Sequence, residues 1–200
     1  MPNWCEVDLL IEGSTKDVKA FRDSVTIENP DDTVNIGILN TQYPTPSILL
    51  RIGAPTTVVE TKTEAREINE KYNIRNIFDG STVYKAITEK QEKLLMQRYG
   101  TTNWYDWNRE HWGTKWSDSD TKVNDFFESS FNDVCMIQYY FRSPWGPPIE
   151  AIRYIAQKWP TLKFMMEYYE GGMGFQGNFV VENDNVIIDT TSDYEGFRGG

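Results

Sequence analysis

The chain has 200 residues, 39% of them hydrophobic and 14% aromatic, so it is long and apolar enough for one folded domain with a buried core. Thirty acidic residues against twenty basic ones give a formal net charge of −10, which disfavours direct binding to nucleic acid or to an anionic membrane. No run of about 20 apolar residues and no positively charged leader is present, so we expect neither a membrane span nor a signal peptide, and a cytoplasmic protein.

The first predicted element is a strand over residues 5–12. Apolar and acidic residues alternate there, which is typical of a strand with one buried and one solvated face. Gly13 ends the strand, and Ser14 followed by Asp17 is typical of a helix start, because the serine hydroxyl caps the first turn. The alternating residues are Cys5, Val7, Leu9 and Ile11 against Glu6, Asp8 and Glu12.

The middle of the chain, residues 27–132, has a less regular pattern. Residues 29–57 are rich in Asn, Asp, Thr and Pro, which indicates loops with one short strand at 48–52. Apolar residues at helical spacing then predict several helices. These predicted helices cover residues 63–72, 83–99 and 122–127.

The last third of the chain regains a clear pattern. A β-branched and aromatic run predicts a strand at 134–141, and Pro147 and Pro148 then open a helix that Pro160 ends. A strand and a hairpin follow. They cover residues 162–169 for the strand, and 175–181 paired with 186–188 for the hairpin.

This order of elements predicts an α+β fold. We expect a ferredoxin-like antiparallel sheet covered on one face by two helices, in a single domain over residues 1–200. The segment at about residues 28–132 is too long for a plain loop, so we expect a large, mostly helical insertion subdomain there.

Three motifs along the chain resemble those of a known family. The start MPNWC before an alternating strand and Gly13, the motif WGTKW at 112–116 and the motif EYYEGGMGF at 167–175 resemble the YubB ferredoxin-like family, an Api-like group found in phages and conjugative plasmids. Val7 departs from the asparagine usual in that family. The resemblance implies the same fold, a mobile-element origin and the cytoplasm of a bacterial host, a setting in which small acidic proteins counter host defences. It brings no activity and no catalytic residues.

Residues with metal-binding or catalytic chemistry are scarce. Cys5 and Cys135 lie in apolar runs, where a free thiol behaves as a small buried hydrophobe. His111 is the only histidine, so we expect a structural hydrogen bond for it and no zinc site. We predict no catalytic residue, no cofactor and no metal site, although carboxylates could bind Mg²⁺ or Ca²⁺.

Four of the seven tryptophans lie between residues 104 and 116. In a helix over residues 104–111, Trp104, Trp107 and His111 share one face, which is what a helix needs in order to pack on a sheet. Alternatively, stacking rings beside the flexible Gly113 and a cation could clasp a planar anionic ligand. Both interpretations stay open, and the second makes Trp104, Trp107, Trp112, Lys115 and Trp116 ligand-binding residues.

The glycine-rich segment at 170–177 also has two interpretations. It matches neither a phosphate loop nor a dinucleotide fingerprint, so it is either a wide hairpin or a loop whose exposed amides bind an anion. In the second case Glu170, Met173 and Phe175 lie at the sheet edge beside the tryptophans, and we add them to the predicted ligand-binding set.

Three functions are compatible with these features. The first is a noncatalytic binding protein whose aromatic cleft sequesters a small nucleotide-like ligand or binds a host defence protein. The second is a metal-dependent enzyme that degrades a nucleotide signal with Mg²⁺ and carboxylates. The third is an acidic DNA mimic that blocks a nucleic-acid-binding host protein. Its carboxylates, otherwise a solvated face, would come from Asp118, Asp120, Asp125, Glu128, Asp133 and residues 189–195.

Overall fold

The computed structural model describes residues 3–75 and 81–196 and divides the chain into two compact units. The larger unit comprises Met1–Pro44 with Trp112–Gly200, and the smaller one Thr45–His111. The smaller unit falls within the expected insertion at 28–132, while the flanking residues of that insertion belong to the larger unit. The elements of the larger unit are β1 (Trp4–Gly13), α1 (Thr15–Val25), β2 (Thr26–Glu28), β3 (Val34–Ile36), α2 (Ile38–Gln42), β7 (Ser119–Glu128), β8 (Cys135–Pro144), α7 (Ile149–Lys158), β9 (Lys163–Glu170), β10 (Phe175–Glu182) and β11 (Asn185–Asp193).

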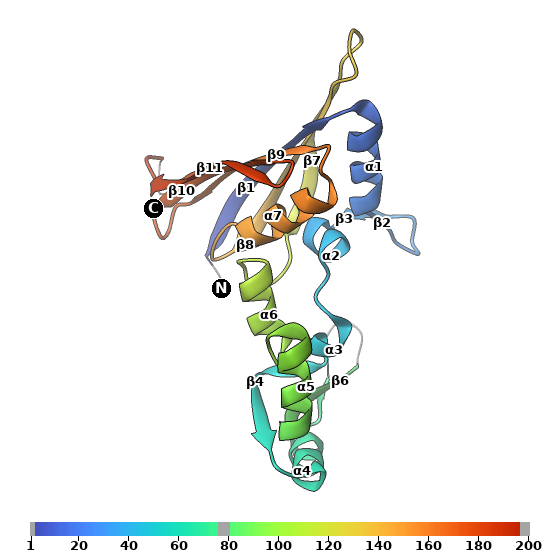
Figure 1. Cartoon of the computed structure of the whole chain (residues 1–200), viewed down its shortest axis with the longest axis vertical. Coiled ribbons are helices and arrows are strands. Elements are labelled where there is room, and N and C mark those ends of the chain that lie inside the picture. Colours follow the sequence, from blue (N-terminus) through green and yellow to red (C-terminus); the bar gives the residue numbers. More distant parts are fainter. Residues whose placement is uncertain (1–2, 76–80, 197–200) are drawn as a thin grey trace. The chain divides into compact units, whose positions relative to one another are not determined.

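The larger unit is the ferredoxin-like α+β domain. Its six-stranded sheet has the order β11-β10-β9-β1-β8-β7, and every neighbouring pair is antiparallel. The order β9-β1-β8-β7, with α1 after β1 and α7 after β8, is the ferredoxin-like arrangement, and the β10-β11 hairpin extends it at one edge. Helices α1 and α7 cover one face of the sheet (Figure 1).

An aromatic core joins the two helices to the sheet. Phe21 of α1 makes edge-to-face contacts with Tyr139 of β8, Trp159 after α7 and Phe164 of β9, at centroid distances of 6.3, 5.4 and 5.6 Å. Each such pair adds about 0.5–1.5 kcal/mol to the area that it buries. The predicted alternation of β1 is confirmed, because its odd-numbered residues 5–11 are fully buried against the helices.

The predicted start of α1 is also confirmed. The side chain of Ser14 accepts a hydrogen bond from the backbone amide of Asp17 at 3.1 Å. This bond satisfies one of the amides that a helix leaves unpaired in its first turn. The strands at 134–141 and 162–169, the helix after Pro148 and the final hairpin are likewise present as β8, β9, α7 and β10-β11.

The helix predicted at residues 122–127 is wrong. These residues belong to β7, which pairs with β8 at the edge of the sheet. Along the chain, β7 is the second of the four strands β1, β7, β8 and β9 that form the ferredoxin-like arrangement. All of them are exposed, and the pairing shifts register between Ser119 and Lys122 and between Val123 and Asp125. An exposed, bulged edge strand loses the two-residue alternation by which strands are recognised in a sequence.

The smaller unit contains a three-stranded sheet of order β4-β6-β5 in addition to its helices, so the insertion is less helical than the sequence suggests. The helix predicted at 63–72 is confirmed, and residues 104–111 form a helix as well. The elements are α3 (Ser47–Leu50), β4 (Ile52–Val59), α4 (Lys62–Tyr72), β5 (Ile74–Arg75), β6 (Thr82–Thr88), α5 (Glu89–Tyr99) and α6 (Trp104–His111).

Two predictions in the smaller unit are wrong. Residues 48–52 form most of helix α3 and only the start of β4, not one strand. The helix expected over 83–99 begins at Glu89, and the residues before it are the strand β6. Thr88 and Gln91 form a capping box, in which the Thr88 amide donates to the Gln91 side chain at 2.9 Å. The helix therefore begins six residues later than predicted.

Both edge strands of the large sheet carry irregular pairing. Besides the two shifts in β7, the pairing of β10 with β11 shifts between Val180 and Val181, where Ile187 of β11 is the additional residue. Such bulges bend a strand and increase its local twist.

Candidate binding surface on the open face of the sheet

The structure divides the predicted tryptophan site between the two units. Trp104 and Trp107 belong to the smaller unit, whereas Trp112, Lys115, Trp116 and the glycine-rich residues belong to the larger one. In the smaller unit Trp104 is half-buried, and Trp107 is 4% exposed and stacks on His111 at 4.3 Å. Nδ1 of His111 lies 3.0 Å from the carbonyl oxygen of Trp107, which is the structural hydrogen bond expected for this histidine.

In the larger unit, Trp112 is a core residue. Its side chain is 2% exposed, and the indole N–H donates to the carbonyl oxygen of Tyr43 at 2.8 Å. Trp116 is half-buried, and Nζ of Lys115 lies 4.6 Å from the centre of its ring, so these two side chains form a cation–π pair. Trp107 and Trp112 are therefore packed, and the ligand-binding role of the tryptophan set stays a prediction.

The glycine-rich loop binds its own carboxylate. Glu170 is 3% exposed and accepts hydrogen bonds from the backbone amides of Gly172, at 3.0 Å, and Met173. The amides expected to bind an external anion are therefore occupied by Glu170 in this fold. Met173 is 61% exposed at the loop, and half-buried Phe175 packs on Tyr168 with ring centres 6.2 Å apart.

The sheet face that α1 and α7 leave uncovered carries a different set of side chains. Paired residues of antiparallel strands lie on the same face, so the register defines this open face as rows that run across the strands. One row is Asp8, Glu167, Asn178 and Thr190, and the next toward the end of β9 is Glu6, Tyr169, Gln176 and Ser192. On the other side of β1, Tyr140 and Arg142 of β8 continue these rows.

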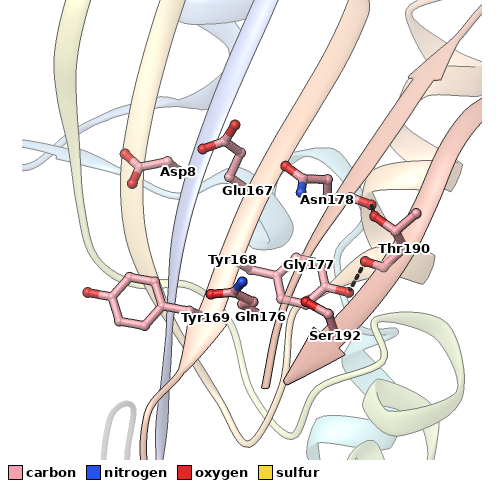
Figure 2. A pocket seen from close by; sticks show the side chains of 9 residues that line it. All are labelled: Asp8, Glu167, Tyr168, Tyr169, Gln176, Gly177, Asn178, Thr190 and Ser192. Carbon is pink, nitrogen blue, oxygen red and sulfur yellow. Dashed lines mark hydrogen bonds between the residues drawn. The ribbon is translucent and has the colours of Figure 1, made fainter. Parts of the chain in front are cut away.

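A cavity of about 360 Å³ lies over the polar rows. Figure 2 shows the side chains of Asp8, Glu167 and Asn178 side by side above the strands. No lysine or arginine lines this cavity in the part of the chain that the structure describes. The lining residues are Asp8, Glu167, Tyr168, Tyr169, Gln176, Gly177, Asn178, Thr190 and Ser192.

Asp8 and Glu167 are direct cross-strand partners in the cavity. Side chains at such positions have Cβ atoms about 4.5–5.5 Å apart, and like charges placed there are destabilising. Asp8 accepts hydrogen bonds from Gln138 at 3.1 Å and Asn124 at 3.3 Å, which holds its carboxylate in place. Glu167 is exposed, and its side chain has no hydrogen bond or ion pair to another described residue. The pair is therefore an unneutralised acidic site.

Aromatic and charged groups flank this acidic pair. The hydroxyl of Tyr140 donates to Glu6, and Nζ of Lys122 lies 4.8 Å from the centre of the Tyr140 ring. Burial and then the bond to Glu6 raise the pKa of Tyr140 to about 12, so this hydroxyl stays a donor well into the alkaline range. Tyr169 stacks on Tyr194 at 5.1 Å. The flank of the cavity is thus a fixed hydrogen-bonding and stacking surface.

We expect the fold to lose stability in alkaline solution. Burial and the charges of Glu170 and Glu6 raise the pKa of the Cys5 thiol from 9.0 to about 12. The pKa of the Tyr140 hydroxyl is likewise raised, from 10.0 to about 12. Since folding favours the protonated forms, their stabilisation is complete below pH 9.0 and is lost as the pH rises toward about 12. The free energy of unfolding measured by urea denaturation at several pH values should fall in this window. Tyr140→Phe should reduce the fall, and Tyr72→Phe, at an exposed tyrosine, is the control; equal slopes for both would contradict the assignment to Tyr140.

Most of the acids considered for a DNA-like surface are engaged inside the chain. Asp118 accepts from the amides of Ile38 and Leu39 at 3.0 and 2.9 Å and so caps α2. The other four acids between residues 120 and 133 also accept hydrogen bonds, and Asp189 forms an ion pair with Arg153 at 3.6 Å, whereas the side chains of Asp193 and Glu195 have no hydrogen bond or ion pair to another described residue. Asp120 accepts from Arg142, Asp125 from the Phe126 amide, Glu128 from Lys19 and Asp133 from the Thr15 amide.

Neither metal-binding clusters nor spanning helices occur in the described ranges. No group of three or more His, Cys, Asp or Glu side chains among residues 3–75 and 81–196 is arranged to hold a metal ion. No helix of these same residues has the length and apolar character needed to cross a membrane.

Only part of the open face could be predicted from the sequence. The alternation of residues 5–12 already placed Glu6 and Asp8 on the solvated side of their strand. Glu167 could have been added, since it occupies the same kind of position in the strand predicted at 162–169. The register that sets Asp8 against Glu167 depends on the tertiary fold, and no local pattern contains it.

A family model described as the ferredoxin-like domain in Api92-like protein matches residues 84–199, more than half of the chain. Among solved structures, the chain is similar to the crystal structure of a protein api92 from Yersinia pseudotuberculosis, with 12% sequence identity, a TM-score of 0.48 and coverage of 98% of this chain and 99% of that one. No curated protein matches the chain. The chain thus belongs to the family of Api92-like proteins that carry this ferredoxin-like domain.

Proposed function

We propose that the protein is an accessory protein of a phage or another mobile element, and that it counters host defence in the bacterial cytoplasm by binding. The resemblance to the YubB family supports this setting. The open face of the sheet supports the mode of action, because it gathers charged, amide and aromatic side chains around one cavity. In this proposal the open face binds a positively charged segment of a host defence protein.

The Asp8–Glu167 pair carries the proposal. Two carboxylates at directly opposed positions cost stability until a cation neutralises them. A lysine or arginine side chain of a protein partner supplies that cation and donates charge-assisted hydrogen bonds to both acids. The same acids repel phosphate groups, so this face favours a protein over the nucleotide-like ligand.

The nucleotide-like ligand stays a prediction for the aromatic residues. With Trp107 and Trp112 buried, binding in the larger unit would depend on Trp116 and Lys115, which already contact each other. The DNA mimic has less support, because the acids from Asp118 to Asp133 that would imitate phosphates are engaged within the fold. The enzyme has no comparable constellation of side chains to support it in the described residues.

Neutralising the acidic pair should weaken binding and stabilise the protein. We expect Asp8→Asn with Glu167→Gln to reduce the affinity for an oligolysine peptide at low salt by about tenfold, which corresponds to about 1.4 kcal/mol. Removing the like-charge contact should raise the free energy of unfolding by about 0.2–1 kcal/mol. Isothermal titration calorimetry measures the first effect and urea denaturation the second.

The matched control removes two acids elsewhere. Glu60 and Glu67 are exposed residues of the smaller unit, and Glu60→Gln with Glu67→Gln changes the net charge by the same amount. Equal loss of oligolysine affinity in both double variants would reveal general charge attraction and refute the site. The site would also be refuted if the folded Asp8→Asn, Glu167→Gln variant kept full activity in a host-protection assay.

A further inference from the structure

The open face also has an apolar row beside the acidic one. Leu10, Met165, Val180 and Ile188 are cross-strand neighbours on β1, β9, β10 and β11. The first three are half-buried, and Ile188 is 41% exposed. On each of these four strands, the residue of the apolar row lies two positions from the residue of the row Asp8, Glu167, Asn178 and Thr190.

These two rows have defined dimensions. Neighbouring strands lie about 4.8 Å apart, so a row over four strands is about 14 Å long. Two residues along a strand span about 7 Å, which is the separation of the apolar row from the acidic row. The surface is therefore a short apolar track with two carboxylates along one side.

We infer that the segment bound by the open face is a basic amphipathic helix lying across β1, β9, β10 and β11. The inference rests on the proposed function and names the form of the partner. The apolar stripe of the helix packs on Leu10, Met165, Val180 and Ile188. Lysine or arginine residues on the adjacent flank of the helix reach Asp8 and Glu167.

The spacing of the acids fits this partner. Residues at i and i+4 of a helix have Cβ atoms about 5–6 Å apart, and directly opposed strand residues have theirs about 4.5–5.5 Å apart. Two basic residues one turn apart can therefore each face one carboxylate. A track of about 14 Å accommodates about nine helical residues, or two and a half turns.

An extended segment fits less well. A partner strand would add to the edge strand β11, but the register shift opposite Val180 and Val181 bulges that edge. A bulged edge pairs poorly with a further strand. A helix can bind the open face without pairing to the edge strand β11, since it satisfies its backbone hydrogen bonds internally.

The test compares two peptides of identical composition on the full chain. One is a lactam-bridged helix of about 14 residues with leucines along one face and lysines along the adjacent flank, and the other has the same residues in an order that forms no such face. Fluorescence anisotropy gives both affinities. We expect the amphipathic helix to bind at least about tenfold more tightly, since two or three leucines add buried apolar area.

Substitutions then locate the contact. Met165→Gln with Val180→Thr keeps side-chain shape and should bring the two peptides within about threefold of each other. Met96→Gln with Val58→Thr changes the same residue types at exposed positions of the smaller unit and should leave the preference unchanged. Circular dichroism checks that each variant folds, and Val180→Thr alone is the milder alternative.

The outcomes separate this inference from the proposed function. Equal binding of both peptides to the wild type, or a preference that survives Met165→Gln with Val180→Thr, overturns the helix inference. In either case Glu167→Gln still tests the acidic site, because it should weaken both peptides. If neither peptide binds, the helix inference and the proposed function both fail.

Discussion

Trp112→Ala is expected to lower the free energy of unfolding of the larger unit by about 3–5 kcal/mol, the usual effect of removing a buried aromatic side chain. Trp112 is 2% exposed, so the alanine leaves a cavity where the indole packs. It also leaves the carbonyl oxygen of Tyr43 without the indole N–H that bonds it at 2.8 Å. Urea denaturation followed by circular dichroism measures the loss.

Trp116→Ala is the matched comparison. Trp116 lies four residues later and is half-buried, so its removal should cost no more than about 1–2 kcal/mol. A small effect of Trp112→Ala, comparable with that of Trp116→Ala, would show that the indole of Trp112 is not part of the core. Binding of its ring to a ligand would then become the better interpretation of the WGTKW motif.

Gly177→Ala is expected to destabilise the protein by about 3 kcal/mol or more. Gly177 lies in β10 opposite Tyr168 of β9 and Thr191 of β11. A methyl group there would overlap the backbone carbonyl oxygen of Thr190 and the hydroxyl end of Tyr168. The hydroxyl of Tyr168 passes over the glycine to bond the carbonyl of Thr190 (Figure 2). It also bonds the side chain of Thr191.

The consequence of Gly177→Ala should be local as well as global. Because Thr190 and Ser192 line the cavity, displacement of β11 should also weaken oligolysine binding. Gly146→Ala is the control, since a methyl group at Gly146 meets no atom within 4 Å. Hydrogen exchange should show faster exchange in β11 for Gly177→Ala alone. Unchanged protection of β11 would contradict the tight fit of Gly177 against Tyr168 and Thr190.

The sequence predicted the fold where one face of an element is buried. β1, β8, α7 and β9 each bury one side, and their apolar periodicity reports this. β7 buries neither side along its central part, so its residues carry no such signal. In β6, the apolar residues Val83, Ala86 and Ile87 happen to lie at helical spacing. The Thr88–Gln91 capping box just after them is a local signal that marks the true start of the helix.

The candidate site was harder to predict than the fold for a related reason. Tryptophans and glycines attract attention because they are rare and chemically versatile, yet Trp112 fills the core and the glycine amides hold Glu170. The open face consists of common residues, and Asp8 and Glu167 are more than 150 positions apart in the chain. Their significance arises from opposition across two strands, which only the register of the sheet provides.

The bulges in β7 and β11 have a consequence for how this protein behaves at high concentration. Regular, exposed edge strands on both sides of a sheet can pair with the edge strands of further copies, which is how β-rich proteins form fibres. Here both edge strands, β7 and β11, are interrupted by register shifts, and the net negative charge makes copies of the protein repel each other. The protein can thus remain dispersed at high concentration while the open face of its sheet stays accessible.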